Sequence, residues 1–393
     1  MIKVILKKSA KKHSSLDSCW IYANEVEKTE NPDKEKNGSL ATVFTADGKF
    51  VGKGYINFLS KILVRIFIRD ERQTDDKNFF TEQIKKAKAL RDDIFEGTGD
   101  DCYRAVFGEA DNLPAFIVDK YADVLSVQFL SLGMDLRKKM LTDILVDIFK
   151  PVCVYERSDV PVREKEGLSQ TKGVLYGELP DGVTVHENGL CLDIDVANGQ
   201  KTGYFLDQKF NRLAIKTYCK NKTVLDCFCN CGGFTVNAAT VAKSVIATDV
   251  SQTALDMVNK NAFLNGQKNV TTLKADVFDL LRKYRDENKK FDVVILDPPA
   301  FTKSADRVAD AVRGYRDVNL SALKIINDGG YLVTCSCSHY IDFNLFLKTV
   351  KEAVIASGRT VRMMEIKTQS PCHASLITSQ ESLYLKFIVL KVG

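Results

Sequence analysis

The chain has 393 residues, of which 45% are hydrophobic and 27% are charged. This composition is typical of globular proteins and excludes a disordered or fibrous chain, and the length suits two or three domains. No run approaches the roughly 18 apolar residues of a membrane span, and the charged first residues cannot form the core of a signal peptide. We therefore expect a cytoplasmic protein with no membrane association, whose 11 cysteines stay reduced.

Basic residues are concentrated near the N-terminus. Residues 1–70 contain 13 Lys and Arg against 8 Asp and Glu, a difference that equals the net charge of +5. Lysines precede the first acidic residue, at Lys3, Lys7, Lys8, Lys11 and Lys12. Because each phosphate contact releases counterions, this cluster favours binding to a nucleic acid. The alternative is a solvated lysine-rich strand edge that discourages aggregation.

Residues 1–71 are predicted to form a small β-rich domain. Apolar alternation predicts strands at 2–6, 40–45, 50–57 and 61–69, and Asp47-Gly48 marks a hairpin. The polar stretch 25–36 is expected to be an exposed loop.

Residues 72–181 are predicted to form a central α/β domain. Helical spacing of apolar residues predicts a helix over 79–95, which ends at Gly97-Thr98-Gly99. The expected elements after it are strands at 103–107, 116–119 and 124–129, a helix at 135–149 and a strand at 152–156.

Residues 182–393 alternate strands and helices in the manner of a parallel sheet with helices on both faces. A strand at 222–228 runs into Asn230, Gly232 and Gly233 before an expected helix at 235–243. Adjacent glycines allow a tight turn and a close approach of the backbone to a ligand. The next strand, 244–248, ends at Asp249.

This loop and the acidic residues around it predict an adenosine-containing cofactor. Asp249 follows Asp226 by 23 residues, a position suited to accept hydrogen bonds from ribose hydroxyls. Asp276, after the third strand, is placed to accept from the adenine amine. Nicotinamide dinucleotides need Gly-x-Gly-x-x-Gly, which is absent, so S-adenosylmethionine is the expected cofactor. Any one of these carboxylates is more often a plain strand-end or capping residue, and it is their series that favours the cofactor.

Three closely spaced cysteines, Cys227, Cys229 and Cys231, do not indicate a metal. Their spacing differs from the Cys-x-x-Cys pattern of zinc sites, and the chain has only 4 histidines. We expect no metal ion.

Two further strands are predicted to end in the reacting groups. The strand 291–296 is followed by Asp297-Pro298-Pro299, where Asp297 is suited to hydrogen-bond a base, and Phe301 to stack on one that is swung out of its helix. A purely structural turn is the alternative. After an expected helix at 310–326, a strand at 331–338 carries Cys335 and Cys337.

Cys337 is the expected nucleophile. Cytosine C5 is weakly nucleophilic, so its methylation requires prior addition of a thiolate to C6. Cys337 lies farther towards the sheet edge than Cys335, which is expected to be a small buried apolar residue. The base that removes the C5 proton stays open among Lys303, Cys335 and water.

Four motifs together resemble the bacterial 23S ribosomal RNA cytosine-C5 methyltransferases that carry an N-terminal PUA domain. They are residues 202–212 (Thr-Gly-Tyr-Phe-Leu-Asp-Gln-Lys-Phe-Asn-Arg), 226–234, 297–301 and 334–338. The similarity spans nearly the whole chain. Two sites depart from the family pattern: Ser18-Cys19-Trp20 stands for His-Pro-Trp, and Cys372-His373-Ala374 for Asp-His-Pro.

The resemblance implies a PUA module at 1–71, a central α/β domain at 72–181 and a Rossmann-like class I methyltransferase domain at 182–393. It implies S-adenosylmethionine as cofactor, 23S ribosomal RNA as partner and 5-methylcytosine as product. The expected catalytic residues are Cys337 and Asp297. The expected cofactor residues are Asp226, Asn230, Gly232, Gly233, Asp249, Asp276 and Gln208, and the expected RNA contacts are Phe301, Lys303, Lys7, Lys8, Lys11 and Lys12.

Two other functions remain as alternatives. One is a guanine N-methyltransferase, since related catalytic domains pair a Phe-Leu-Asp run with an Asp-Pro-Pro turn and need no thiol. The other is an RNA-binding or ribosome-assembly factor without activity, which the series of strand-end carboxylates argues against. The sequence leaves the target nucleotide, the form of the substrate (naked RNA or a ribosomal particle) and the oligomeric state open, with a homodimer as one option.

Overall fold

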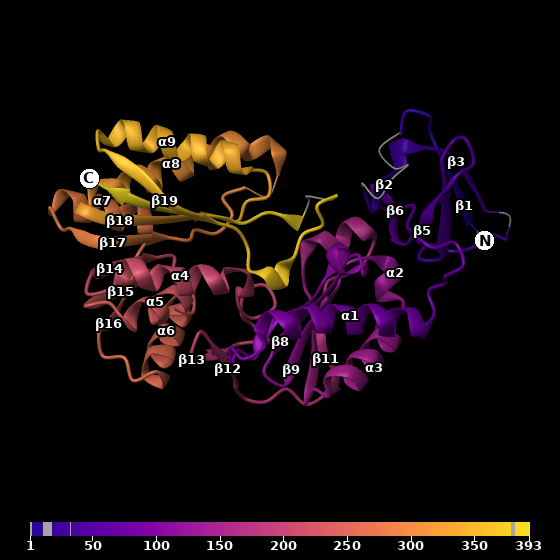
Figure 1. Cartoon of the computed structure of the whole chain (residues 1–393), viewed down its shortest axis with the longest axis horizontal. Coiled ribbons are helices and arrows are strands. Elements are labelled where there is room, and N and C mark those ends of the chain that lie inside the picture. Colours follow the sequence, from indigo (N-terminus) through magenta and orange to yellow (C-terminus); the bar gives the residue numbers. More distant parts are fainter. Residues whose placement is uncertain (1, 11–17, 32, 303, 379–381) are drawn as a thin grey trace. The chain divides into compact units, whose positions relative to one another are not determined.

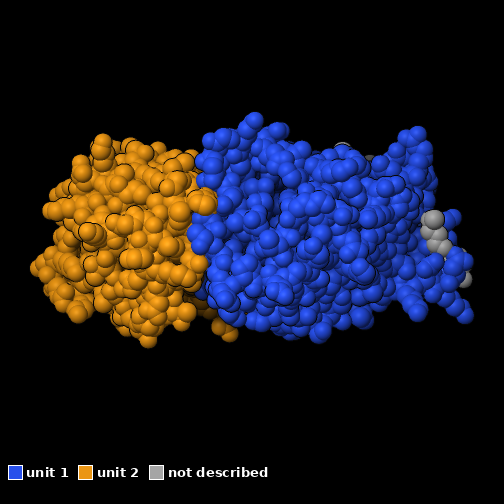
Figure 2. Space-filling model, turned by 90° about the horizontal axis from the view of Figure 1, so that it is seen from below, with its two compact units in different colours: residues 1–185, 194–205, 371–382 blue, residues 186–193, 206–370, 383–393 orange. Residues whose placement is uncertain are grey.

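The computed structural model describes residues 2–10, 18–31, 33–302, 304–378 and 382–393 (Figure 1). The chain forms two compact units, which Figure 2 distinguishes by colour. Unit 1 comprises residues 1–185, 194–205 and 371–382, and unit 2 comprises residues 186–193, 206–370 and 383–393. In the described part of the chain, no helix combines the length and the apolar character that crossing a membrane requires.

The first sheet of unit 1 has six strands in the order β2-β6-β5-β4-β1-β3. Its strands are β1 (Ile2–Leu6), β2 (Trp20–Tyr22), β3 (Val26–Glu30), β4 (Leu40–Phe44), β5 (Phe50–Ile56) and β6 (Ile62–Ile68). The four strands predicted from apolar alternation are confirmed to within one residue at each end. The loop expected at 25–36 is wrong in part. Strand β3 lies there, at the sheet edge, and pairs with β1 through its backbone. Its side chains are mostly polar, so the sequence showed no apolar alternation that would predict a strand.

The second sheet of unit 1 has five strands in the order β11-β10-β9-β8-β7. The elements are α1 (Lys77–Phe95), β7 (Cys102–Phe107), β8 (Phe116–Tyr121), β9 (Val124–Phe129), α2 (Leu132–Asp135), α3 (Lys138–Phe149), β10 (Cys153–Ser158) and β11 (Thr171–Gly177). The expected helix at 135–149 is confirmed as α3, which begins three residues later, and the short helix α2 precedes it. Strand β11 was not predicted because it is an edge strand whose side chains are exposed or half-buried.

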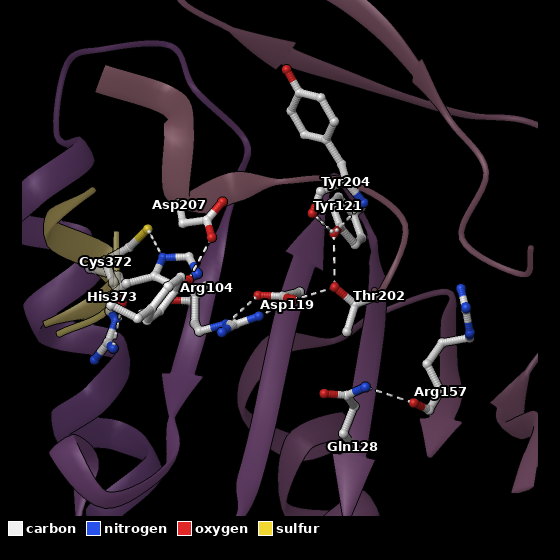
Figure 3. Close-up of polar contacts among 12 residues, drawn as sticks. Arg104, Asp119, Tyr121, Gln128, Arg157, Thr202, Tyr204, Asp207, Cys372 and His373 are labelled. Carbon is white, nitrogen blue, oxygen red and sulfur yellow. Dashed lines mark hydrogen bonds and ion pairs between the residues drawn. The ribbon is translucent and has the colours of Figure 1, made fainter. Parts of the chain in front are cut away.

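A buried polar network anchors residues 194–205 to this sheet (Figure 3). Arg104 donates two hydrogen bonds of 2.8 Å to Asp119, and Thr202 Oγ1 donates to the same carboxylate. The Tyr121 hydroxyl accepts from the Tyr204 amide at 3.0 Å. Because these groups satisfy one another, the buried charges are paired, as a stable interior requires.

The sheet of unit 2 has seven strands in the order β16-β15-β14-β17-β18-β20-β19. Its strands are β14 (Thr223–Cys227), β15 (Ser244–Asp249), β16 (Val270–Lys274), β17 (Phe291–Leu296), β18 (Ile326–Ser336), β19 (Val361–Lys367) and β20 (Lys386–Val392). The first five in spatial order are parallel, and β20 is antiparallel to both of its neighbours. A separate two-stranded sheet consists of β12 (Val183–Glu187) and β13 (Leu190–Ile194).

Helices cover both faces of the seven-stranded sheet. They are α4 (Lys209–Cys219), α5 (Gly233–Ala239), α6 (Gln252–Leu264), α7 (Val277–Asp286), α8 (Val308–Lys324) and α9 (Phe343–Ser357). Successive residues of β14 point to opposite faces of the sheet. Leu225 packs with α7, α8 and α9, whereas Val224 packs with α4 and α5. The predicted α/β class is confirmed, and the parallel strands place their carboxyl ends along one edge.

The boundaries expected at residues 71 and 181 stay a prediction. The two sheets of unit 1 belong to a single compact unit, and β12 contributes to both units. The expected strand at 331–338 begins earlier, at Ile326, so Gly329-Gly330 lies inside β18 rather than at its start.

Candidate functional site

Asp226 ends the apolar run of β14 as a buried carboxylate, only 1% exposed. The Thr235 hydroxyl donates to Oδ2 at 2.6 Å, while Oδ1 is buried with no hydrogen-bond partner among the described residues. Burial raises the pKa of Asp226 to about 7, and repulsion from Asp249 and Asp297 adds to the shift. A buried acceptor of this kind is costly unless a ligand donor satisfies it, so the residue fits a cofactor that carries an ammonium group.

The backbone after β14 turns through left-handed conformations into α5. Phe228, Asn230 and Gly232 have φ values of 64°, 49° and 87°. A Cβ on Gly232 would also lie 3.1 Å from a methyl carbon of Val258, so this position requires glycine. Gly233 then begins the helix. The glycine pair therefore shapes the loop as predicted, although its contact with the cofactor stays a prediction.

Asp249 closes this loop from the end of β15. Its Oδ2 accepts from the Asn230 amide at 3.1 Å and its Oδ1 accepts from the Ser251 amide at 2.9 Å. The side chain is partly buried, and both of its oxygens accept hydrogen bonds from backbone amides. The expected ribose contact stays a prediction.

Asp276 is the N-cap of α7. One oxygen, Oδ1, accepts from the amides of Phe278 and Asp279 at 2.9 and 3.2 Å. Asp276 is therefore a helix-capping residue, which was the alternative considered for each of these carboxylates. A contact with adenine would use its other oxygen, Oδ2.

Asp297 follows β17 and is held by a residue from a distant part of the chain. Gln208 Nε2 donates to Asp297 Oδ1 at 3.0 Å, and Asn211 in turn donates to Gln208 Oε1 at 2.6 Å. The sequence assigned Gln208 to the cofactor, but the structure brings it to the expected catalytic carboxylate. The hydrophobic pattern gives no signal for this contact, which joins positions 89 residues apart.

Phe301 is half-buried in a row of aromatic rings. Its ring centroid lies 6.0 Å from that of Phe278 and 4.5 Å from that of Tyr315. Gly314 faces the ring, where a Cβ would come within 3.1 Å of it. The ring is thus fixed by packing, and its use as a stacking face for a base stays a prediction.

Cys337 directly follows β18 and is partly buried, whereas Cys335 is fully buried. Burial raises the pKa of the Cys335 thiol well above its usual value. Cys335 is thus the buried residue expected from the sequence. Two side chains that the sequence did not single out hold the segment around Cys337. The Tyr315 hydroxyl lies 2.9 Å from Ser338 Oγ, and Lys386 Nζ donates to the Ser338 carbonyl at 2.8 Å.

The three cysteines of the β14 loop are buried or partly buried, and burial raises the pKa of Cys231 to about 12. Among the described residues, no group of three or more His, Cys, Asp or Glu side chains is arranged to hold a metal ion.

The lysines expected to contact RNA are only partly described. Lys7 Nζ donates to the Asn24 carbonyl at 2.8 Å, and Lys8 is exposed. Lys11, Lys12 and Lys303 lie outside the described residues.

Known proteins resemble the chain over most of its length. A family model for S-adenosylmethionine-dependent methyltransferases matches residues 168–372, and one for PUA-like domains matches residues 4–69. Relatives described as ribosomal RNA large subunit methyltransferase I are 41% identical over 379 residues in Vibrio cholerae (95% of each chain) and 39% over 377 in Aeromonas salmonicida (95% and 94%). A Streptococcus mutans structure, assigned as a SAM-dependent methyltransferase, matches with a TM-score of 0.84 at 19% identity over 100% of both chains.

The fold, the strand-end carboxylates and these matches define the class: the chain is an S-adenosylmethionine-dependent methyltransferase with an N-terminal PUA-like domain. More particularly, it belongs to the ribosomal RNA large subunit methyltransferase I family. The resemblance stated from the sequence motifs, the fold class and the cofactor are therefore confirmed. The individual site residues stay predictions.

Proposed function

We propose that the protein methylates C5 of a cytosine in ribosomal RNA and that Cys337 is its nucleophile. Relatives of about 40% identity are described as ribosomal RNA large subunit methyltransferases, which supports this class of substrate and, with it, a site of action in the cytoplasm. The observation that carries the chemistry is the position of Cys337. Cys337 is partly buried and follows β18, which pairs with β17, the strand that Asp297 follows.

The reaction follows from the order of bonds that form and break. The Cys337 thiolate adds to C6, and the electron pair of the C5=C6 bond attacks the methyl carbon from C5. When bound, S-adenosylmethionine supplies this methyl group on a positively charged sulfur, which keeps the bonding pair as the methyl leaves. Loss of the C5 proton to a base restores the double bond and expels the thiolate from C6.

Asp297 is suited to hold the base in position for this addition. Its Oδ1 accepts from Gln208, which orients the carboxylate, and a carboxylate accepts hydrogen bonds of the kind that the exocyclic amine of cytosine donates. The residue that accepts the C5 proton stays open between Lys303 and water. Cys335 is less suited, because a fully buried thiol with a raised pKa is poorly placed to exchange a proton with the substrate.

The PUA-like domain is proposed to contribute RNA affinity through its lysines. Lys7 and Lys8 follow β1, and the domain contains the whole excess of positive charge in the chain. Contacts of this kind with phosphate are independent of base sequence and weaken with salt. Lys11 and Lys12 extend the same basic segment. A homodimer remains a prediction.

The test compares the wild-type protein with Cys337→Ala on ribosomal RNA from cells that lack the protein. Mass spectrometry of the digested nucleosides is expected to detect 5-methylcytidine from the wild type and a loss on the order of a thousandfold with the variant. Cys191→Ala, which alters another partly buried thiol of unit 2, is the matched control and should keep full activity. Methylation by Cys337→Ala at the wild-type rate, or a methylguanosine product, would overturn the proposal.

A further inference from the structure

Lys386 is a buried lysine that lies beside the proposed nucleophile. It is the first residue of β20, where it pairs with Ser336 of β18, and it is only 5% exposed. Its Nζ donates to the Ser338 carbonyl at 2.8 Å and to the Tyr384 carbonyl at 2.6 Å. One of these two hydrogen bonds therefore fixes the backbone immediately after Cys337.

The ammonium group of Lys386 has no carboxylate partner within ion-pair distance among the described residues. An ammonium carries three N–H donors, and two of them are used by neutral carbonyl oxygens. A buried positive charge without a counter-ion is costly, so such a site favours a negative charge nearby. Burial accordingly lowers the pKa of Lys386 to about 8, and the negative charges of Cys337 and Asp342 oppose this shift. The positive charge of Lys386 and a negative charge on Cys337 therefore favour each other.

Several other titratable groups of the described part of the chain lie near Cys337. Tyr315 on α8 has its pKa raised to about 12 by burial and is neutral. Cys335 on β18 is a buried thiol with a raised pKa. Asp342 is negative and engaged as the N-cap of α9, where it accepts from the Leu345 amide at 2.8 Å. His339, two residues beyond Cys337, is exposed to solvent.

We propose that Lys386 is a positioning residue that stabilises the thiolate of Cys337 and holds its backbone in place. The inference rests on the proposed function, since it takes Cys337 as the nucleophile. A cation next to a cysteine favours the thiolate, which is the attacking form of the sulfur. The thiol proton passes to solvent, and Lys386 keeps its own proton throughout. The same charge stabilises the thiolate when it is expelled from C6 at the end of the reaction.

The test measures the alkylation rate of Cys337 by iodoacetamide as a function of pH, with the modified peptide quantified by mass spectrometry. The wild-type midpoint is expected below the value of about 8.5 for a free cysteine. Lys386→Met should raise the midpoint by about one pH unit and slow alkylation at pH 7 by roughly tenfold. Lys386→Arg should keep the midpoint low, because guanidinium keeps the charge.

Lys391→Met is the matched control, because this lysine lies on the same strand and donates to the Tyr331 hydroxyl at 3.1 Å, away from Cys337. It should leave the alkylation profile unchanged. A folded Lys386→Met protein with the wild-type profile would overturn the inference. If that variant does not fold, Lys386→Arg decides: a midpoint at or below the wild-type value supports the proposal, and a midpoint near 8.5 overturns it.

The alkylation readout does not depend on methyl transfer, so the two proposals can fail separately. If Cys337→Ala methylates RNA normally, the proposed nucleophile is wrong whatever the alkylation profile. If Cys337→Ala is inactive but Lys386→Met leaves the profile unchanged, only the role of Lys386 is wrong.

Discussion

The two ends of the candidate site in unit 2 are built in different ways. Where β14 and β15 end, Asp226 and Asp249 are held by groups close in sequence: Thr235 lies 9 residues from Asp226, and Asn230 lies 19 residues from Asp249. Where β17 and β18 end, Asp297 is held by Gln208 at a separation of 89 residues, and the segment of Cys337 by Lys386 at 48. The proposed cofactor end is thus held by contacts that are short in sequence, whereas the proposed reacting end is held by contacts between distant segments.

This difference has a physical reason. A glycine turn, a capping residue and a strand-end carboxylate are determined by neighbours along the chain, so their sequence pattern is readable. At the end of β18, the backbone after Cys337 is held by Lys386 of the antiparallel strand β20, a contact that no local sequence pattern indicates. If the two ends have separate tasks, substitutions at one should change cofactor binding and substitutions at the other should change the chemical step.

The largest effect is expected at the cofactor end with Asp249→Ala. Loss of charge-assisted hydrogen bonds should weaken S-adenosylmethionine binding roughly 10- to 100-fold, while RNA affinity stays within about twofold. Isothermal calorimetry and RNA filter binding measure the two constants. Asp256→Ala, on an exposed position of α6, is the control and should change neither. Equal losses for cofactor and RNA would show that the ribose contact is misplaced.

A smaller effect is expected at the reacting end with Gln208→Leu. Because Gln208 donates to Asp297, its loss should lower kcat roughly tenfold and leave cofactor affinity unchanged. Gln252→Leu, whose side chain reaches Asp256 on the surface of α6, is the matched control. A weakened cofactor affinity with a normal kcat would instead show that Gln208 contacts the cofactor, as the sequence predicted.

The smallest effect concerns the stability of the cofactor-free protein. Because the pKa of Asp226 is raised to about 7, the folded state holds a proton that the unfolded chain releases near pH 4. The free energy of unfolding therefore falls as the pH rises from about 4 to 7. Above pH 7 the contribution of Asp226 no longer changes, and the protein keeps this lower stability. Asp226→Asn removes the titration.

We therefore compare the Tm of Asp226→Asn with that of the wild type at two pH values. The Tm of the variant minus that of the wild type should be roughly 2–4 °C larger at pH 8 than at pH 5. Differential scanning fluorimetry without cofactor measures it. Thr240→Val is the control, because this solvent-facing residue near the end of α5 has no titrating group. Its difference in Tm from the wild type should be the same at both pH values. The same advantage at both pH values would contradict the raised pKa.

Much of the fold could be predicted because burial imposes a pattern on the sequence. Strand β17 is apolar and buried except at Asp292, and its predicted bounds match the structure. The edge strands β3 and β11 could not be predicted, since their pairing uses the backbone while their side chains meet solvent. The short helix α2 before α3 was likewise not predicted.

The candidate site divides in the same way. Asp226, the glycine pair and Cys337 were predicted from residue type and from their place at strand ends. Tyr315 and Lys386 were not, because a tyrosine inside a helix and a lysine at the start of an apolar strand have no distinctive pattern. Only the fold brings them to Cys337.

The most direct measurement of the central claim uses RNA with 5-fluorocytosine at the target position. Fluorine cannot leave C5 as a proton does, so the adduct between the enzyme and C6 persists after methyl transfer. We predict a denaturant-resistant complex of one enzyme per RNA that requires S-adenosylmethionine and whose cross-linked peptide maps to Cys337. An enzyme that methylates normal RNA but gives no complex, or a cross-link at another residue, would contradict the account.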